Sequence, residues 1–322
     1  MEQSTSRARR AAVLSTVFVL LLAACSKSTN HSTGGSTPSG GTTASPTAVN
    51  GNGQPVNVLY AGSLAGLMTN QIGPAFQAAT GYKFNGTGAG STALASGIKS
   101  GVYQGDVFLS AAAAPNASLM GSANGNWVSW YATIATSGLV LGYNPSSTYA
   151  SAITSRPWYN AVTLNGFKLG RTDPKTDPKG VLAAQAVTTT AAAGGLSPAV
   201  SNPTALKALV AATNTGNVFD ETSLVAQLQT KQLDAAFFYT IEAQASGIKT
   251  VPLTGPASTL HATYTITILN KASDEAGAEA FVNFLLGKTG QAFMTTDQFQ
   301  LVTPPSVTGT GEPAGLNTAL GM

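Results

Sequence analysis

The chain has 322 residues, of which 43% are hydrophobic and only 9% are charged. Its formal net charge is +3, and removal of residues 1–24 takes away three arginines and one glutamate, which leaves a charge near +1. No basic patch interleaved with aromatic residues occurs, so the composition argues against nucleic acid as a partner. Residues 55–322 are enough for one large lobe or two medium ones.

The first 25 residues have the pattern of a secretion signal. Three arginines within residues 7–10 precede the apolar run Ala11–Ala24, which is too short to span a membrane. The run ends in LAAC, and this tetrad resembles the bacterial lipobox, in which a signal peptidase cuts before the cysteine and the thiol is diacylated. Two acyl chains make a stable anchor. We therefore predict a signal peptide over 1–24, a lipidated Cys25 and an extracytoplasmic protein anchored to the bacterial cell membrane.

Cys25 is the only cysteine, so the folded part is expected to have no disulfide. The segment 26–54 consists almost entirely of Ser, Thr, Gly, Asn and Pro. Such a composition cannot bury apolar surface, and it is typical of a flexible tether. Residues 25–54 are therefore expected to hold a folded domain away from the membrane.

Short apolar runs then alternate with amphipathic stretches. Strands are predicted at Val56–Tyr60 and within 82–88, and the helix after the first strand is expected to have Ser63 as its N-cap and to stop at Gly81. A short helix is expected to begin near Ser91. The next strand is Gly105–Ala111.

The second half of the chain continues this alternation. Further strands are predicted at 137–144, 166–171, Leu233–Thr240 and Ala262–Leu269, with helices from about Val181, after Thr240 and after an N-cap at Ser273. Strands that alternate with helices predict an α/β protein with mainly parallel sheets flanked by helices. In such sheets ligands bind beyond the carboxyl ends of the strands.

Two turns of this kind have a serine where a strand gives way to a helix, at Ser63 and Ser91. Each presents a hydroxyl group and unsatisfied backbone N–H groups at the positive end of a helix, which suits an anion. The alternative is that each serine only caps its helix.

The segment GRTDPKTDPKG, from Gly170 to Gly180, concentrates five charged residues in a chain that has few. One interpretation is a solvated surface turn broken by two prolines. The other is a loop that meets a charged ligand.

Several segments after the tether resemble, in the same order, extracellular solute-binding proteins of ABC importers, and most closely the molybdate- and tungstate-binding branch. They are LYAGSL, GAGSTALASGIKSGVYQGDVFLSA, GLVLGYN, GRTDPKTDPKG, LDAAFFYTIEA and FLLGKTGQAFM followed by TPP. The resemblance implies a two-lobed periplasmic-binding-protein fold of type II, with the ligand cleft between the lobes. We expect lobe 1 to comprise 55–132 and 264–322, and lobe 2 to comprise 133–263.

The resemblance also implies five ligand-binding residues. Ser63 and Ser91 match two family serines that donate hydrogen bonds to the oxyanion, and Tyr239 matches a tyrosine whose hydroxyl does the same. Asp177 lies where tungstate-binding relatives have a carboxylate, and Lys179 lies where a backbone N–H meets the ligand.

One position departs from the tungstate-type pattern. Those relatives have a glutamate directly before the tyrosine, and this chain has Phe238. Glu242, one helical turn further on, is a candidate replacement, although an acid on a helix surface is the simpler interpretation.

Asp177 has three possible roles. A carboxylate about 4 Å from an anion costs roughly 4 kcal/mol per unit of ligand charge at an effective dielectric near 20. Asp177 could therefore coordinate the Mo or W atom of the bound oxyanion, or accept a proton from a protonated oxyanion and so reject sulfate. Its third possible role is that of a turn residue neutralised by Lys175, Lys179 or Arg171.

The expected function is capture of a tetrahedral oxyanion, molybdate or tungstate, and its delivery to an ABC permease by a monomeric protein without a cofactor or a metal site of its own. Alternatives are a sulfate- or phosphate-type anion binder, or an anchored hydrolase or sensor on the same fold. His261 is the single histidine after the tether, and no G-x-S-x-G elbow surrounds Ser63 or Ser91. An enzyme is therefore not expected.

Overall fold

The computed structural model describes residues 50–211 and 213–322. The predicted signal peptide (1–24), the predicted lipidation site Cys25 and residues 25–49 of the predicted tether lie outside these ranges. Within the described residues, no helix has the length and apolar character needed to cross a membrane.

The strands in the described residues are β1 (Pro55–Ala61), β2 (Lys83–Ala89), β3 (Val107–Ser110), β4 (Trp130–Tyr143), β5 (Leu169–Thr172), β6 (Val218–Phe219), β7 (Ala235–Tyr239), β8 (Lys249–Pro252), β9 (His261–Ile268) and β10 (Gln300–Gly309). The α-helices are α1 (Ala65–Leu67), α2 (Gly73–Thr80), α3 (Ser91–Lys99), α4 (Ala113–Ala117), α5 (Ala150–Ser155), α6 (Trp158–Ala161), α7 (Pro178–Ala192), α8 (Pro203–Ala208), α9 (Glu221–Gln229), α10 (Thr240–Ala245), α11 (Glu275–Leu286), α12 (Lys288–Thr296) and α13 (Asn317–Leu320). Shorter helical turns are η1 (Gly62–Leu64), η2 (Met68–Ile72), η3 (Ser122–Asn124), η4 (Gly255–Thr259) and η5 (Ala314–Leu316).

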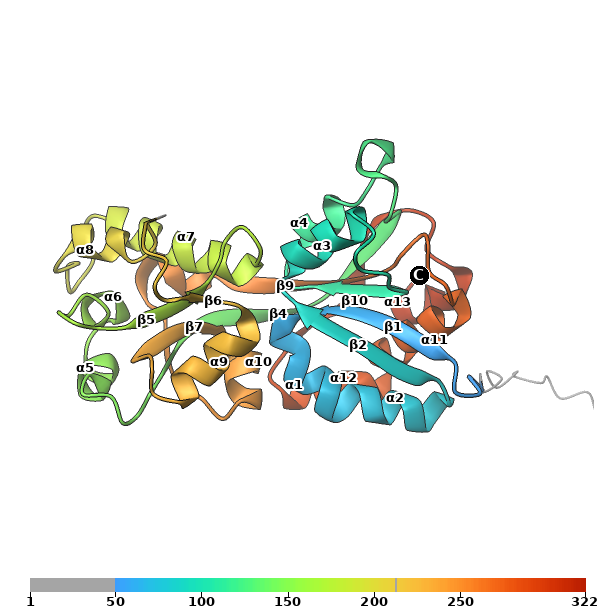
Figure 1. Cartoon of the computed structure of the whole chain (residues 1–322), viewed down its shortest axis with the longest axis horizontal. Coiled ribbons are helices and arrows are strands. Elements are labelled where there is room, and N and C mark those ends of the chain that lie inside the picture. The colour runs from blue at the N-terminus through green and yellow to red at the C-terminus, as the bar shows by residue number, and fades with distance from the viewer. Residues whose placement is uncertain (1–49, 212) are drawn as a thin grey trace, which may run out of the picture. The chain divides into compact units, whose positions relative to one another are not determined.

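The α/β alternation predicted from the sequence is confirmed, and helices flank the strands (Figure 1). The helical stretch after β1 ends at Gly81, whose φ of 73° is left-handed and suits a residue without a Cβ. Two N-cap predictions are wrong. Ser63 lies inside η1 and makes no capping bond, and the N-cap of α11 is Asp274, which accepts a hydrogen bond from the Gly277 N–H at 2.9 Å.

The strands form one path in the order β2-β1-β3-β9-β4-β7-β5-β6, with β8 and β10 also paired to β4. Pairing is parallel between β1 and its neighbours β2 and β3, and between β5 and its neighbours β6 and β7. It is antiparallel wherever β4 or β9 takes part. The expectation of mainly parallel sheets is therefore corrected to a mixed arrangement.

The long strand β4 explains why parallel and antiparallel pairs occur together. It also determines where the carboxyl ends of the parallel strands lie. Its residues Ala132–Gly138 pair with β9, and its residues Leu139–Tyr143 pair with β7. Through these pairings β1, β2 and β3 run in the direction of β4, whereas β5 and β7 run against it. The carboxyl ends of the two groups of parallel strands therefore point toward each other.

Alternation along β7 separates two neighbouring aromatic residues. Tyr239 belongs to the main apolar core, whereas Phe238 packs in a smaller cluster with Leu224 and Leu228 of α9. Successive side chains of a strand point to opposite faces, yet both rings at this strand end lie near the Lys179 ammonium, whose Nζ is 5.4 Å from the centre of the Phe238 ring and 5.8 Å from that of Tyr239. The lobe boundaries at 132/133 and 263/264 remain a prediction.

Candidate functional site

Four of the five predicted ligand residues lie at carboxyl ends of strands. Ser63 follows β1, Ser91 follows β2, Asp177 comes five residues after β5, and Tyr239 ends β7. Because the two groups of strands point toward each other, the ends of β1 and β2 come close to those of β5 and β7. Lys179 lies in the first turn of α7, two residues after Asp177.

The two serines are buried and already engaged. Ser63 Oγ lies 3.0 Å from Tyr264 Oη of β9, and Ser91 Oγ accepts a hydrogen bond from the Ala111 N–H at 3.1 Å. Neither hydroxyl caps its own helix. Each serine hydroxyl therefore bonds to a residue distant in sequence and not to the start of its own helix. A hydroxyl group can take part in more than one hydrogen bond, so both serines can still contact a ligand.

The TDPK loop, residues 172–179 at the junction of β5 and α7, contacts the turn that contains Ser91. The Ala93 N–H donates to the Thr176 carbonyl at 3.0 Å. A Cβ at Gly90 would overlap that carbonyl oxygen and would lie 3.2 Å from Asp177 Cβ. Only a glycine at position 90 allows the loop to approach this closely.

Asp177 caps helix α7. Its Oδ1 accepts a hydrogen bond from the Lys179 N–H at 2.7 Å, and its Oδ2 is buried with no hydrogen-bond partner among the described residues. Arg171 donates instead to the carbonyls of Leu209, Thr172 and Asn214, and Lys175 is exposed. Of the three cations considered as partners of Asp177, only Lys179 remains close.

The Lys179 N–H, which was predicted to meet the ligand, is thus occupied by Asp177 in this structure. The Lys179 side chain is itself fully buried, and its Nζ lies 2.7 Å from both carboxylate oxygens of Glu242. It also lies 3.2 Å from Glu221 Oε1, in an ion pair without hydrogen-bond geometry.

The simpler interpretation of Glu242 as a surface acid is wrong, because the residue is 5% exposed and its Oε2 also accepts from the Tyr239 N–H at 3.4 Å. Sequence reasoning missed Glu221 altogether. This residue follows the N-cap Asp220 of α9, a position where an acid is common, so nothing local signals its burial against a lysine.

Burial and neighbouring charges shift several pKa values here. Burial, together with Glu221, raises the pKa of Asp177 well above its ordinary value. Burial raises the pKa of Glu242 to about 7, and Glu221 adds to the rise while Lys179 opposes it. Burial lowers the pKa of Lys179, but Glu242 and Glu221 outweigh it and the pKa ends above its ordinary value.

Some buried polar atoms in this region lack a hydrogen-bond partner within the described part of the chain. They are Asp177 Oδ2, Glu221 Oε1, Tyr239 Oη and Thr172 Oγ1. Buried polar groups in proteins are nearly always paired, with protein, water or ligand. The orphaned atoms of Asp177 and Tyr239 therefore suit contact with a polar ligand.

An open cavity of about 200 Å³ reaches this cluster. Its lining includes Gly62, Ser63, Glu221, Thr222, Glu242 and Ser246. Across residues 50–211 and 213–322, no group of three His, Cys, Asp or Glu side chains has the spacing to hold a metal ion.

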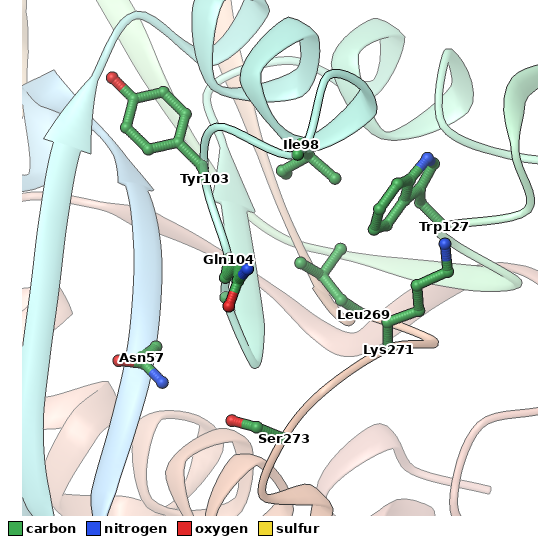
Figure 2. Close-up of a pocket in the computed structure, with 10 residues that line it drawn as sticks. Asn57, Ile98, Tyr103, Gln104, Trp127, Leu269, Lys271 and Ser273 are labelled. Carbon is green, nitrogen blue, oxygen red and sulfur yellow. The ribbon is translucent and has the colours of Figure 1, made fainter.

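A second cavity, of about 290 Å³, lies elsewhere and is shown in Figure 2. Its lining includes Trp127 and Lys271, and the Lys271 Nζ lies 3.7 Å from the centre of the Trp127 ring. None of the five predicted ligand residues lines it. The candidate anion site is therefore the cluster around Asp177 and Lys179.

His261 does not join either serine. Its Nδ1 lies 2.8 Å from the Thr259 carbonyl, and its side chain is exposed. The described residues show no hydrogen bond from His261 to Ser63 or Ser91, so no serine–histidine pair is formed.

Comparison with known proteins gives a family and two relatives. A family model described as bacterial extracellular solute-binding protein matches residues 56–300. An uncharacterized solute-binding protein of Halobacterium salinarum is 30% identical over 248 residues, which cover 71% of this chain and 79% of that protein. A putative ABC transporter molybdenum-binding protein of Haloferax volcanii is 33% identical over 113 residues, which cover 35% of this chain and 34% of that protein.

Two solved structures share the fold. The periplasmic molybdate-binding protein of Azotobacter vinelandii matches with a TM-score of 0.59 and 17% identity, over 77% of this chain and 99% of that one. The sulfate-binding protein SubI of Mycobacterium tuberculosis matches with a TM-score of 0.51 and 16% identity, over 83% of this chain and 96% of that one. The chain thus shares the mixed α/β fold of these two proteins, with strands flanked by helices.

Proposed function

Because the chain belongs to the bacterial extracellular solute-binding protein family, we propose that it captures a tetrahedral oxyanion, molybdate or tungstate, and delivers it to the permease of an ABC importer. The partial relative that is named as molybdenum-binding and the shared fold with a molybdate-binding protein support this ligand class. The lipobox-like tetrad ending at Cys25 supports attachment of the protein to the outer face of the cell membrane.

The observation that carries the proposal is that Asp177 Oδ2 and the Tyr239 hydroxyl are both buried without a hydrogen-bond partner among the described residues. The Asp177 carboxylate is fixed by its bond to the Lys179 N–H, and neither Arg171 nor Lys175 neutralises it. Of the three cations in the turn-residue interpretation, only Lys179 remains close to Asp177, so it is the unpartnered Oδ2 that favours contact with a ligand. Hydroxyl groups of Ser63, Ser91 and Tyr239 would donate to the anion.

A carboxylate in this place discriminates between anions. When Asp177 is ionised, its carboxylate is purely repulsive toward a fully ionised sulfate, by roughly 4 kcal/mol per unit of ligand charge at about 4 Å and an effective dielectric near 20. The raised pKa of Asp177 reduces the fraction of the protein in which this repulsion acts. With molybdate or tungstate the same oxygen can approach the Mo or W atom, and with a protonated anion it can accept the proton. Asp177 therefore acts as the selective element of the site.

A panel of anions tests the proposal by thermal unfolding of the mature protein. Molybdate or tungstate is expected to raise the melting temperature in a concentration-dependent way, because ligands that bind the native state stabilise it. Sulfate, phosphate and arsenate are expected to give smaller shifts. The transport proposal fails if none of these anions shifts the melting temperature while an ester substrate is turned over.

Asp177→Asn is expected to weaken molybdate binding by roughly 10- to 100-fold, the equivalent of one charge-assisted contact, and to strengthen sulfate binding. The matched control is Asp173→Asn in the same loop, since the hydrogen bond that the Asp173 carboxylate accepts comes from the Lys175 N–H, at 2.9 Å. Titration calorimetry measures both. Equal or tighter molybdate binding by Asp177→Asn would exclude a favourable contact between the ligand and this carboxylate.

A further inference from the structure

The ion cluster beneath the proposed anion site has an unbalanced charge. One ammonium, Lys179 Nζ, faces two carboxylates at 2.7 and 3.2 Å, those of Glu242 and Glu221. All three side chains are at most 5% exposed, and the carboxylate of Asp177 lies beside them. With every group ionised, three negative charges surround one positive charge, before any anion is added.

The groups around Glu242 come from four elements. Lys179 and Asp177 belong to the start of α7, Glu221 to α9, Tyr239 to the end of β7 and Tyr264 to β9. Lys179 is the only cation among them. The two tyrosines contribute hydroxyl groups, and the Tyr239 N–H contributes one hydrogen bond to Glu242 Oε2.

A bound anion would add negative charge to a region that already has too much. Within residues 50–211 and 213–322, no arginine or second lysine lies within salt-bridge distance of Glu221 or Glu242 to offset this charge. Besides donation from the hydroxyl groups of Ser63, Ser91 and Tyr239, the cluster can offset the added charge by protonating a carboxylate. The open cavity of about 200 Å³ that reaches Glu221 and Glu242 gives a proton access from solvent.

We propose that Glu242 takes up a proton when the anion binds, so that the ligand is captured together with one proton from solution. This inference rests on the proposed function, because it concerns the same anion. Glu221 Oε1 lies 3.2 Å from the same ammonium without a hydrogen bond, so two carboxylates share one cation, and a proton on Glu242 relieves this crowding when the anion arrives. Lys179 remains charged throughout and keeps the two helix starts of α7 and α10 together.

The pKa of Glu242, about 7 because of burial and Glu221, supports this assignment. The sign follows from linkage: a group that binds a proton together with the ligand makes the affinity fall as pH rises above its ligand-free pKa. The dissociation constant for molybdate is therefore expected to be nearly constant well below pH 7 and to rise by up to about tenfold per pH unit above it.

Titration calorimetry of molybdate at pH 7.8, in Tris and in HEPES, measures the protons exchanged, because the two buffers differ in ionisation enthalpy. The wild-type protein is expected to take up close to one proton per anion. In Glu242→Gln the uptake is expected to fall toward zero and the affinity to lose its pH dependence. Glu279→Gln, a carboxylate outside the cluster, is the control and is expected to behave as wild type.

Binding by the wild-type protein without proton uptake overturns the inference and leaves the proposed function standing. Uptake that persists in Glu242→Gln but disappears in Asp177→Asn would place the proton on Asp177 and overturn the assignment to Glu242. A folded wild-type protein that binds none of the anions overturns the proposed function itself. If Glu242→Gln does not fold, the pH dependence and proton count of Glu221→Gln decide the matter: the inference expects both to be reduced.

Discussion

Lys179→Met is expected to lower the free energy of unfolding by about 3–5 kcal/mol, because it leaves two buried carboxylates without their cation. Methionine fills a similar volume, so the loss is one of charge rather than of packing. The deficit should be larger at pH 8 than at pH 5. Without Lys179, the pKa of Glu242 in the folded state loses the largest influence that lowers it, and only the bond from the Tyr239 N–H still does so. A carboxyl group whose folded pKa exceeds its unfolded pKa makes stability fall as pH rises from the unfolded pKa to the folded pKa.

Urea denaturation at the two pH values measures this effect. Lys175→Met is the matched control, since Lys175 lies in the same loop with an exposed side chain, and surface substitutions of this kind stay within about 0.5 kcal/mol. Equal stabilities for the two variants would show that the buried ion cluster is not formed in solution.

Gly90→Ala is expected to weaken molybdate binding by roughly 10- to 100-fold, which corresponds to the loss of one charge-assisted hydrogen bond. The added methyl group would overlap the Thr176 carbonyl, and a backbone atom cannot move aside as the end of a side chain can. The TDPK loop, with Asp177, would have to retreat from the turn at Ser91. The φ of −57° at Gly90 suits alanine, so the effect would not arise from backbone strain.

Gly216→Ala is the control for this substitution, because its new methyl group would meet no atom within 4 Å and its φ is not left-handed. Titration calorimetry of both variants should show loss of affinity only at position 90. Unchanged molybdate binding by Gly90→Ala would mean that contact between the loop and the Ser91 turn does not shape the site. Gly62→Ala would place a methyl group against the Glu221 side chain. It therefore tests whether the glycine before Ser63 is also needed for close packing at the site.

Local patterns predicted much of the fold. The strands at Val56–Tyr60 and Ala262–Leu269 and the helix stop at Gly81 follow from short-range hydrophobic periodicity and from the conformational freedom of glycine. The expected N-caps at Ser63 and Ser273 were wrong for a common reason. Each side chain finds a partner distant in sequence, Tyr264 Oη for Ser63 and Asp106 Oδ1 for Ser273.

The candidate site was predicted less completely. Resemblance identified Asp177 and Tyr239 at the facing strand ends, and their direct contact with a ligand stays a prediction. The cluster formed by Lys179, Glu221 and Glu242 brings together residues 42 and 63 positions from the lysine. No local pattern distinguishes such acids from surface acids at helix starts, because their burial depends on how β4 directs the two groups of strands toward each other.

The central claim is that an oxyanion binds at Asp177 and its facing turns. A crystal structure of the mature protein with tungstate, with the tungsten located by its anomalous scattering, tests this most directly. The account predicts one dominant tungsten site within bonding reach of Asp177 and Tyr239, beside Ser63 and Ser91. Tungsten bound instead in the cavity beside Lys271, or no bound tungsten in a well-ordered crystal, would contradict it.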